Sequence, residues 1–197
     1  NILAEGETFF EIGSIAVSPD NEIVSFSYDN VGRRIYTIQF KNLKTGEIFQ
    51  DQITNTTGKA VWANDNHHIF YIRKDENLRA FQVYLHELGK DSSLDILIFH
   101  EKNEAFDVNV YKTKSLEYIF ISSSSTISDE HRFIPADNVL AEWKILQPRE
   151  DDLEYAVEHF NNDFYIITNA DNATNFKIVK TKVENCRKEN WTERKYY

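Results

Sequence analysis

Short runs of alternating or wholly apolar residues, separated by polar turns, recur along the chain. The first stretch contains four such runs, at residues 14–18, 23–27, 35–40 and 47–53. The first two flank the turn Ser18-Pro19-Asp20-Asn21, where proline presets the backbone and Asp and Asn tolerate the tight geometry. The last two are separated by a turn that ends in Gly46, the residue type that best accepts a positive φ. The pattern therefore predicts four short antiparallel strands.

The same order of strands and turns repeats about every 46 residues. The clearest copies read Val17-Ser18-Pro19-Asp20-Asn21 and Trp62-Ala63-Asn64-Asp65-Asn66, and Tyr118 matches Phe164 in the later copies. The further strands are expected at 60–63, 69–73, 82–87, 95–99, 107–111, 118–122, 131–136, 142–146 and 154–159. Residues 151–159 have a composition that also suits a short helix, but their place in the repeat favours a turn entering a strand. A repeated unit of this kind and length is typical of β-propeller blades.

The predicted fold is all-β, a partial β-propeller of about four four-stranded antiparallel blades. The expected blades span approximately 14–57, 58–104, 105–150 and 151–197. Each blade has two faces with apolar side chains that only neighbouring blades can cover, so we expect the chain to be part of a longer protein and to self-associate in isolation. The polar stretch Cys186–Tyr197 is expected to expose Trp191, Tyr196 and Tyr197.

Composition supports a globular, β-rich protein. Hydrophobic residues make up 41% of the chain and aromatic residues 14%, which favours half-buried strands over disorder. The formal net charge of −10 disfavours binding to nucleic acid or to an anionic membrane surface. No apolar stretch reaches membrane-spanning length and the first residues do not resemble a signal peptide. The single cysteine, Cys186, fits a reducing compartment, so a cytoplasmic location is expected.

The sequence predicts no catalytic, cofactor-binding or metal-binding residue. None of the six glycines flanks a serine in a Gly-x-Ser-x-Gly elbow, and the run 122–126 is interpreted as a strand end and loop. The histidines form no zinc-binding pair, including the adjacent His67 and His68 at a turn. Asp151, Asp152 and Glu154 are expected in a solvated turn.

Arg33 and Arg34 form a short basic pair in this acidic chain. The favoured interpretation is a solvated strand start or an ion pair with Asp29. Contact with another domain or with a peptide stays open as the alternative.

Ordered motifs along nearly the whole chain resemble the oligopeptidase B (protease II) branch of the prolyl oligopeptidase family of serine peptidases. In order, they are Leu3-Ala4-Glu5-Gly6, Phe9-Phe10-Glu11-Ile12-Gly13, Val17-Ser18-Pro19-Asp20-Asn21, Asp29-Asn30-Val31-Gly32-Arg33-Arg34-Ile35-Tyr36-Thr37, Asn55-Thr56-Thr57-Gly58, Val61-Trp62-Ala63-Asn64-Asp65-Asn66, Phe70-Tyr71-Ile72-Arg73-Lys74-Asp75, Val83-Tyr84-Leu85-His86-Glu87-Leu88-Gly89, Ser124-Ser125-Thr126, Glu130-His131-Arg132, Glu154-Tyr155, His159 and Phe164-Tyr165-Ile166-Ile167-Thr168-Asn169.

The resemblance implies a seven-bladed propeller that caps an α/β-hydrolase domain carrying Ser, Asp and His. It implies hydrolysis of short peptides after Arg or Lys, with the propeller excluding folded proteins. The hydrolase domain is expected to lie outside this chain, so no catalytic residue is carried over and the chain alone is expected to be inactive. The alternative is a non-enzymatic propeller that binds protein partners through its loops.

Overall fold

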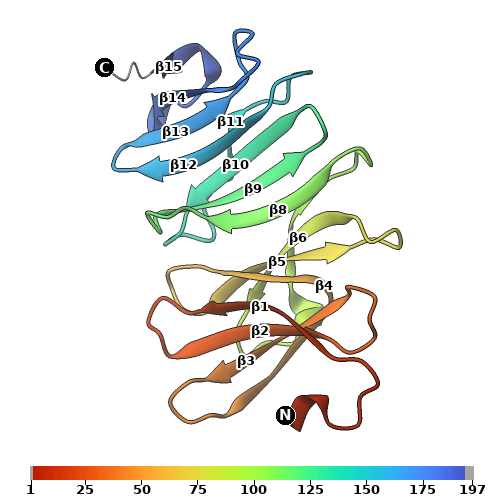
Figure 1. Ribbon diagram of the computed structural model, residues 1–197. Helices are drawn as coiled ribbons and strands as arrows, with labels where there is room; N and C mark the ends of the chain where they lie inside the picture. Colours follow the sequence, from red (N-terminus) through yellow and green to blue (C-terminus); the bar gives the residue numbers. More distant parts are fainter. Residues whose placement is uncertain (1, 194–197) are drawn as a thin grey trace. The chain divides into compact units, whose positions relative to one another are not determined.

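The computed structural model describes residues 2–193, which form β-strands joined by turns and short 3₁₀ segments (Figure 1). Within these residues there is no α-helix, as the sequence predicted. The chain divides into two compact units, Asn1–Val110 and Tyr111–Tyr197, and each is described separately.

The first unit contains one antiparallel sheet in the order β1-β2-β3-β4-β5-β6-β7. Its strands are β1 (Glu11–Val17), β2 (Ile23–Asp29), β3 (Tyr36–Asn42), β4 (Ile48–Trp62), β5 (His68–Lys74), β6 (Ala80–Glu87) and β7 (Ile96–His100), with 3₁₀ segments η1 (Ile2–Ala4) and η2 (Ser92–Leu94). The two turns recognised in the first repeat are confirmed, because Asn21 and Gly46 have φ angles of 63° and 77°. Turn chemistry thus sets the first four strands in register.

Strand β4 differs from the prediction, which placed two separate strands at 47–53 and 60–63. The structure has one strand of 15 residues, whose first half pairs with β3 and whose second half pairs with β5. Asn55 and Gly58 have positive φ angles of 61° and 86°, and the register with β5 shifts between Thr56 and Ala60. These features bend the strand without ending it. The seven-stranded sheet therefore runs through the first expected blade boundary, and the four blade boundaries stay a prediction.

The 46-residue period also appears as direct contacts between equivalent positions. The backbone N–H of Asp20 donates to Asn66 Oδ1 at 2.9 Å, and Trp62 Nε1 donates to the Ala16 carbonyl at 3.2 Å. Each pair is 46 residues apart. Matching parts of successive repeats are therefore neighbours in space. A buried cluster accompanies them, formed by Ile38, Phe40, Ile53, Ala60, Trp62, Ile69 and Tyr71.

Two four-stranded antiparallel sheets follow, in the orders β11-β10-β9-β8 and β12-β13-β14-β15. Their strands are β8 (Asp107–Lys112), β9 (Tyr118–Ser124), β10 (Asp129–Pro135), β11 (Lys144–Gln147), β12 (Tyr155–Phe160), β13 (Asp163–Thr168), β14 (Lys177–Lys182) and β15 (Thr192–Glu193), with 3₁₀ segments η3 (Val183–Asn185) and η4 (Lys188–Asn190). Strand β12 confirms the strand interpretation of residues 154–159. The all-β class is confirmed.

Side chains from these two sheets and from the segments that join their strands form the core of the second unit. It consists of Phe120, Phe133, Leu146, Leu153, Tyr155, Val157, Phe164, Ile166, Ala170, Val179 and Cys186. Trp191 packs against this cluster, and its Nε1 donates to the Cys186 carbonyl at 2.9 Å. The prediction that Trp191 is exposed was therefore wrong, because an indole can bury its ring while its N–H binds a nearby carbonyl. Tyr196 and Tyr197 lie outside the described residues.

Candidate functional site

Chemically capable side chains gather around three buried histidines, His86, His131 and His159. Each has hydrogen-bonding partners that define what it can do. Histidine is a common general base in enzymes, so these partners decide whether each imidazole could accept a proton from a nucleophile.

His86 on β6 lies between two carboxylates. Its Nδ1 is 2.7 Å from Asp95 Oδ1, and its Nε2 is 3.2 Å from Asp51 Oδ1. Tyr71 OH donates to the other oxygen of Asp95 at 2.8 Å. Burial alone would lower the pKa of His86, but the hydrogen bonds and negative charges of Asp95 and Asp51 raise it overall. With both nitrogens occupied, His86 has no free lone pair with which to activate a nucleophile.

His131 on β10 is buried in the second unit and is neutral. Burial lowers its pKa to about 4. Its Nε2 is 2.9 Å from the Tyr155 carbonyl and its Nδ1 is 3.3 Å from Tyr111 OH. The Tyr111 hydroxyl also donates to the Val157 carbonyl at 3.2 Å, a contact between residues 46 positions apart. These bonds connect β10 with β12, and the ring is enclosed, so the role of His131 is structural.

His159 on β12 is close to both a serine and a carboxylate. Its Nδ1 is 2.9 Å from Ser115 Oγ and 3.8 Å from Glu117 Oε1. A catalytic triad places serine and acid on opposite ring nitrogens, whereas here both approach the same one. Nε2 is buried without a hydrogen-bond partner, and the rings of Tyr118 and Phe164 pack against the imidazole. This arrangement cannot relay a proton to a substrate.

Replacing Ser115 with alanine tests the structural role of its contact with His159. We expect Ser115→Ala to lower the free energy of unfolding by about 1–2 kcal/mol because His159 loses a buried hydrogen bond. Urea unfolding measures the loss, with Ser124→Ala as the control. An unchanged stability in Ser115→Ala would show that the contact between Ser115 and His159 does not support the fold.

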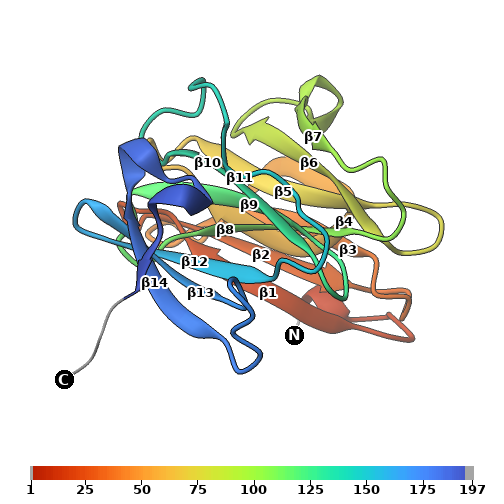
Figure 2. The same ribbon diagram turned by 90° about the horizontal axis from the view of Figure 1, so that it is seen from above.

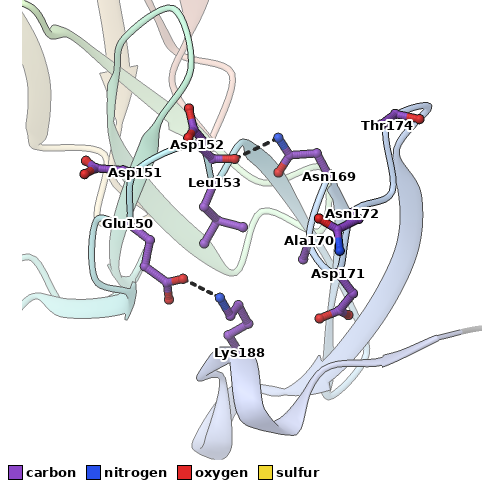
Figure 3. A pocket seen from close by; sticks show the side chains of 10 residues that line it. All are labelled: Glu150, Asp151, Asp152, Leu153, Asn169, Ala170, Asp171, Asn172, Thr174 and Lys188. Carbon is purple, nitrogen blue, oxygen red and sulfur yellow. Dashed lines mark hydrogen bonds and ion pairs between the residues drawn. The ribbon is translucent and has the colours of Figure 1, made fainter.

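The second unit also carries a polar groove made of two hollows, one of which is shown in Figure 3. Two adjoining hollows of about 370 and 520 Å³ lie beside the β11–β12 and β13–β14 connections and η4. They share Glu150, Ala170, Asp171 and Lys188. Glu150 forms an ion pair with Lys188, and Asp171 pairs with Lys177 at 2.8 Å. The hydrogen bond from Lys177 lowers the pKa of Asp171. The shared carboxylates are thus already neutralised by lysines, and the groove offers polar contacts without a nucleophile.

Two of the acidic residues predicted in a solvated turn border this groove. Asp151 and Asp152 are exposed, whereas Glu154 is half-buried. Asn169 Nδ2 donates to the Asp152 carbonyl at 3.0 Å, which joins the two connections (Figure 3). In residues 2–193, no three His, Cys, Asp or Glu side chains gather as potential metal ligands. Over the same residues, no helix has the length and apolar character needed to cross a membrane.

The basic pair Arg33-Arg34 follows a turn held by Asp29. The Asp29 carboxylate, 1% exposed, accepts the backbone N–H groups of Val31, Gly32 and Arg34 at 2.7–2.9 Å. Burial would raise the pKa of Asp29, but these amides lower it overall. Asp29 is therefore paired with backbone rather than with a guanidinium group, and both arginine side chains are exposed, as in the solvated interpretation.

The run 122–126 ends β9, where Arg149 Nη2 donates to Ser123 Oγ at 2.9 Å.

Antiparallel sheets built from units that repeat about every 46 residues define the class of the fold as a segment of a β-propeller. Residues 1–194 match the family described as prolyl oligopeptidase, N-terminal beta-propeller domain. The chain belongs to this family, which confirms the resemblance found in the sequence.

Relatives and solved structures agree with this family. Dipeptidyl aminopeptidase BI of Pseudoxanthomonas mexicana is 38% identical over 98% of the chain and 27% of its own length. Protease 2 of Moraxella lacunata is 33% identical over 91% of the chain and 26% of its own length. Oligopeptidase B from Leishmania major matches with a TM-score of 0.92 and 29% identity, covering 98% of this chain and 27% of that one. Oligopeptidase B from Trypanosoma brucei matches with a TM-score of 0.89 and 27% identity, covering 100% and 28%. The chain thus spans about a quarter of the length of these proteins.

Proposed function

We propose that this chain is the substrate-gating propeller portion of a serine peptidase that hydrolyses short peptides after Arg or Lys. The observation that carries the proposal is the likeness to oligopeptidase B over nearly the whole chain, together with the lack of a usable nucleophile–base pair in residues 2–193. The catalytic serine, its base and the groups that read the basic side chain then belong to a hydrolase domain of the same parent chain.

A second candidate activity differs in where the peptide is cut. The relative from Pseudoxanthomonas mexicana is named a dipeptidyl aminopeptidase, and its 38% identity favours the release of dipeptides from peptide amino termini. Such an enzyme needs a free α-amino group on its substrate. An oligopeptidase accepts a blocked amino terminus.

One set of peptides separates the candidates. The full-length protein is incubated with a ten-residue peptide containing one central Arg, with the amino terminus either free or acetylated, and the products are identified by mass spectrometry. We expect cleavage after Arg at similar rates for both forms, and no cleavage by the 197-residue chain alone. Cleavage that requires the free amino terminus and releases dipeptides supports the second candidate. Hydrolysis by the isolated chain contradicts both.

Gating is tested with the same full-length protein. We expect it to cut the central-Arg peptide but to leave that sequence intact within an exposed loop of a folded protein. Rapid cleavage of the folded protein would contradict gating. A parent reading frame without a Gly-x-Ser-x-Gly motif followed by Asp and His would instead support the non-enzymatic scaffold.

The proposal also includes location and self-association. Cytoplasmic location is supported by the buried, unpaired Cys186. Self-association of the isolated chain is supported by the exposed apolar side chains Ile15 on β1 and Ile167 on β13, at 64% and 51% exposure. Light scattering on the isolated chain at high concentration is expected to show species larger than a monomer, and a strict monomer would contradict this.

A further inference from the structure

The connection between β6 and β7 is held against β4 by a buried group of charges centred on His86. This connection carries η2 and lies beside β7 in Figure 2. The imidazole of His86 is fully buried, and the side chains of Asp51 and Asp95 are 5% and 2% exposed. Asp51 comes from β4, and Asp95 is the last residue before β7. We call the group of Asp51, His86 and Asp95 the His86 latch.

Hydrogen-bond geometry requires a proton on each ring nitrogen of His86. An ionised carboxylate only accepts hydrogen bonds, and each nitrogen faces a carboxylate oxygen. Neutral imidazole has one N–H, so its other nitrogen would direct a lone pair at an oxygen. The imidazolium ion satisfies both contacts and offsets the buried negative charge.

The remaining groups around the ring cannot replace this proton. Phe40 on β3 stacks on the imidazole, with ring centroids 5.8 Å apart. Tyr71 on β5 already donates to Asp95, and Asp91 before η2 adds a further negative charge near His86. The facing titratable groups are therefore Asp51, Asp95, Asp91 and Tyr71. Loss of the proton leaves two buried carboxylates without a cation.

Other bonds of the connection to β4 are few and include Asp51 itself. The backbone N–H of Gly89 donates to Asp51 Oδ1 at 2.5 Å, and Ser92 Oγ donates to the Gln52 carbonyl at 3.2 Å. Both lie at the edge of a solvent-open hollow of about 420 Å³. Of the two leucines near its ends, Leu88 packs against the buried cluster that contains Phe40, whereas Leu94 is 69% exposed. Opening of the connection therefore disturbs the apolar core at Leu88, at the margin of the cluster.

We propose that the His86 latch holds the connection between β6 and β7 against β4 in a pH-dependent way. The connection is closed when His86 is protonated and opens locally when that proton is lost. The proposal is independent of the peptidase activity proposed above.

The direction of the pH effect follows from linkage. In the closed state the pKa of His86 is raised above its ordinary value of 6.5, which applies once the latch opens and the ring meets water. Below pH 6.5 both states hold the proton, so the latch has its full stability. Between pH 6.5 and the raised pKa, opening releases one proton, and the open fraction increases about tenfold per pH unit. Above the raised pKa of His86 both states have lost the proton, so the open fraction no longer changes with pH.

Amide hydrogen exchange of the full-length protein, read by mass spectrometry from pH 6 to 9, tests the latch. Rates are divided by the intrinsic rate at each pH to give protection factors. We expect protection of residues 88–95 to fall above pH 6.5, by about tenfold per pH unit until the raised pKa of His86 is reached, while protection of the turn between β3 and β4 stays constant. Asp51→Asn keeps the shape of the side chain but removes one charge. It is expected to lower protection of 88–95 about tenfold at pH 6.5 and to flatten the pH dependence.

Two further variants complete the test. His86→Gln removes the titrating group and is expected to abolish the pH dependence, whereas His67→Gln, at an exposed turn, is expected to behave as the unmodified protein. Constant protection of 88–95 from pH 6.5 to 9 in the unmodified protein would overturn the proposal. So would an unchanged pH slope in Asp51→Asn, or a loss of protection that spreads over all strands of the unit.

Discussion

Replacing Phe164 with alanine is expected to lower the free energy of unfolding of the unit Tyr111–Tyr197 by about 3–5 kcal/mol. Phe164 on β13 is fully buried. Its ring centroid lies 5.4 Å from that of Phe120 and 4.9 Å from that of Phe133, both in edge-on geometry. It therefore joins the two sheets of the unit, and its removal leaves a cavity that the remaining rings cannot fill.

Phe160 on β12 is the matched control, because it belongs to the same hairpin but is 62% exposed. We expect Phe160→Ala to change the stability by less than about 0.5 kcal/mol. Urea unfolding followed by near-ultraviolet circular dichroism measures both variants. Equal losses in the two variants would mean that the aromatic cluster does not hold the sheets together.

Gly58→Ala is expected to lower the free energy of unfolding of the first unit by about 3 kcal/mol, through two separate effects. Gly58 has φ +86°, a conformation that alanine adopts with strain. An added Cβ would also lie 2.7 Å from Ser27 Oγ and 2.8 Å from Tyr36 Cγ, closer than van der Waals contact permits. Clash adds to strain because both neighbours belong to the packed sheet.

Gly46→Ala separates the two effects. Gly46 has a similar φ of +77°, but an added Cβ would meet no atom within 4 Å. Only the strain of alanine at a positive φ remains, so we expect the free energy of unfolding to fall by about 1 kcal/mol. Thermal and urea unfolding of both variants give the difference, and similar losses for Gly46→Ala and Gly58→Ala would show that the close approach to Tyr36 costs nothing.

Local sequence signals predicted most of the strands but not every boundary. Turns with a proline, an Asx residue or a terminal glycine were found because the chemistry of one short segment determines them, as at Asn21 and Gly46. The sequence predicts a break within β4, since Asn55 and Gly58 also suit a loop, and only the pairing with β3 and β5 shows that the strand continues. The polar residues that surround Trp191 in the sequence predict an exposed side chain, whereas its packing against the core depends on residues distant in the chain.

The His86 latch could not be found by the same reasoning. Asp51 precedes His86 by 35 residues and Asp95 follows it by 9, so no short motif contains the group. Strand alternation does not single out His86 either, since Leu85 and His86 are both buried on β6. Nor did sequence indicate that Ser115 and His159, 44 residues apart, would meet. Such groups depend on which strands pair, and that is decided by the whole sheet.

The continuous strand β4 determines how the first unit can be divided. Its first half completes the ladder of β3 and its second half starts the ladder of β5, with Thr56 paired to both strands. Truncation at any point between β3 and β5 removes a hydrogen-bonding partner from one of them and leaves an edge strand with unpaired backbone N–H and C=O groups. The smallest transplantable module in this half of the chain is therefore the complete set from β1 to β7, twice the size that a repeat count suggests.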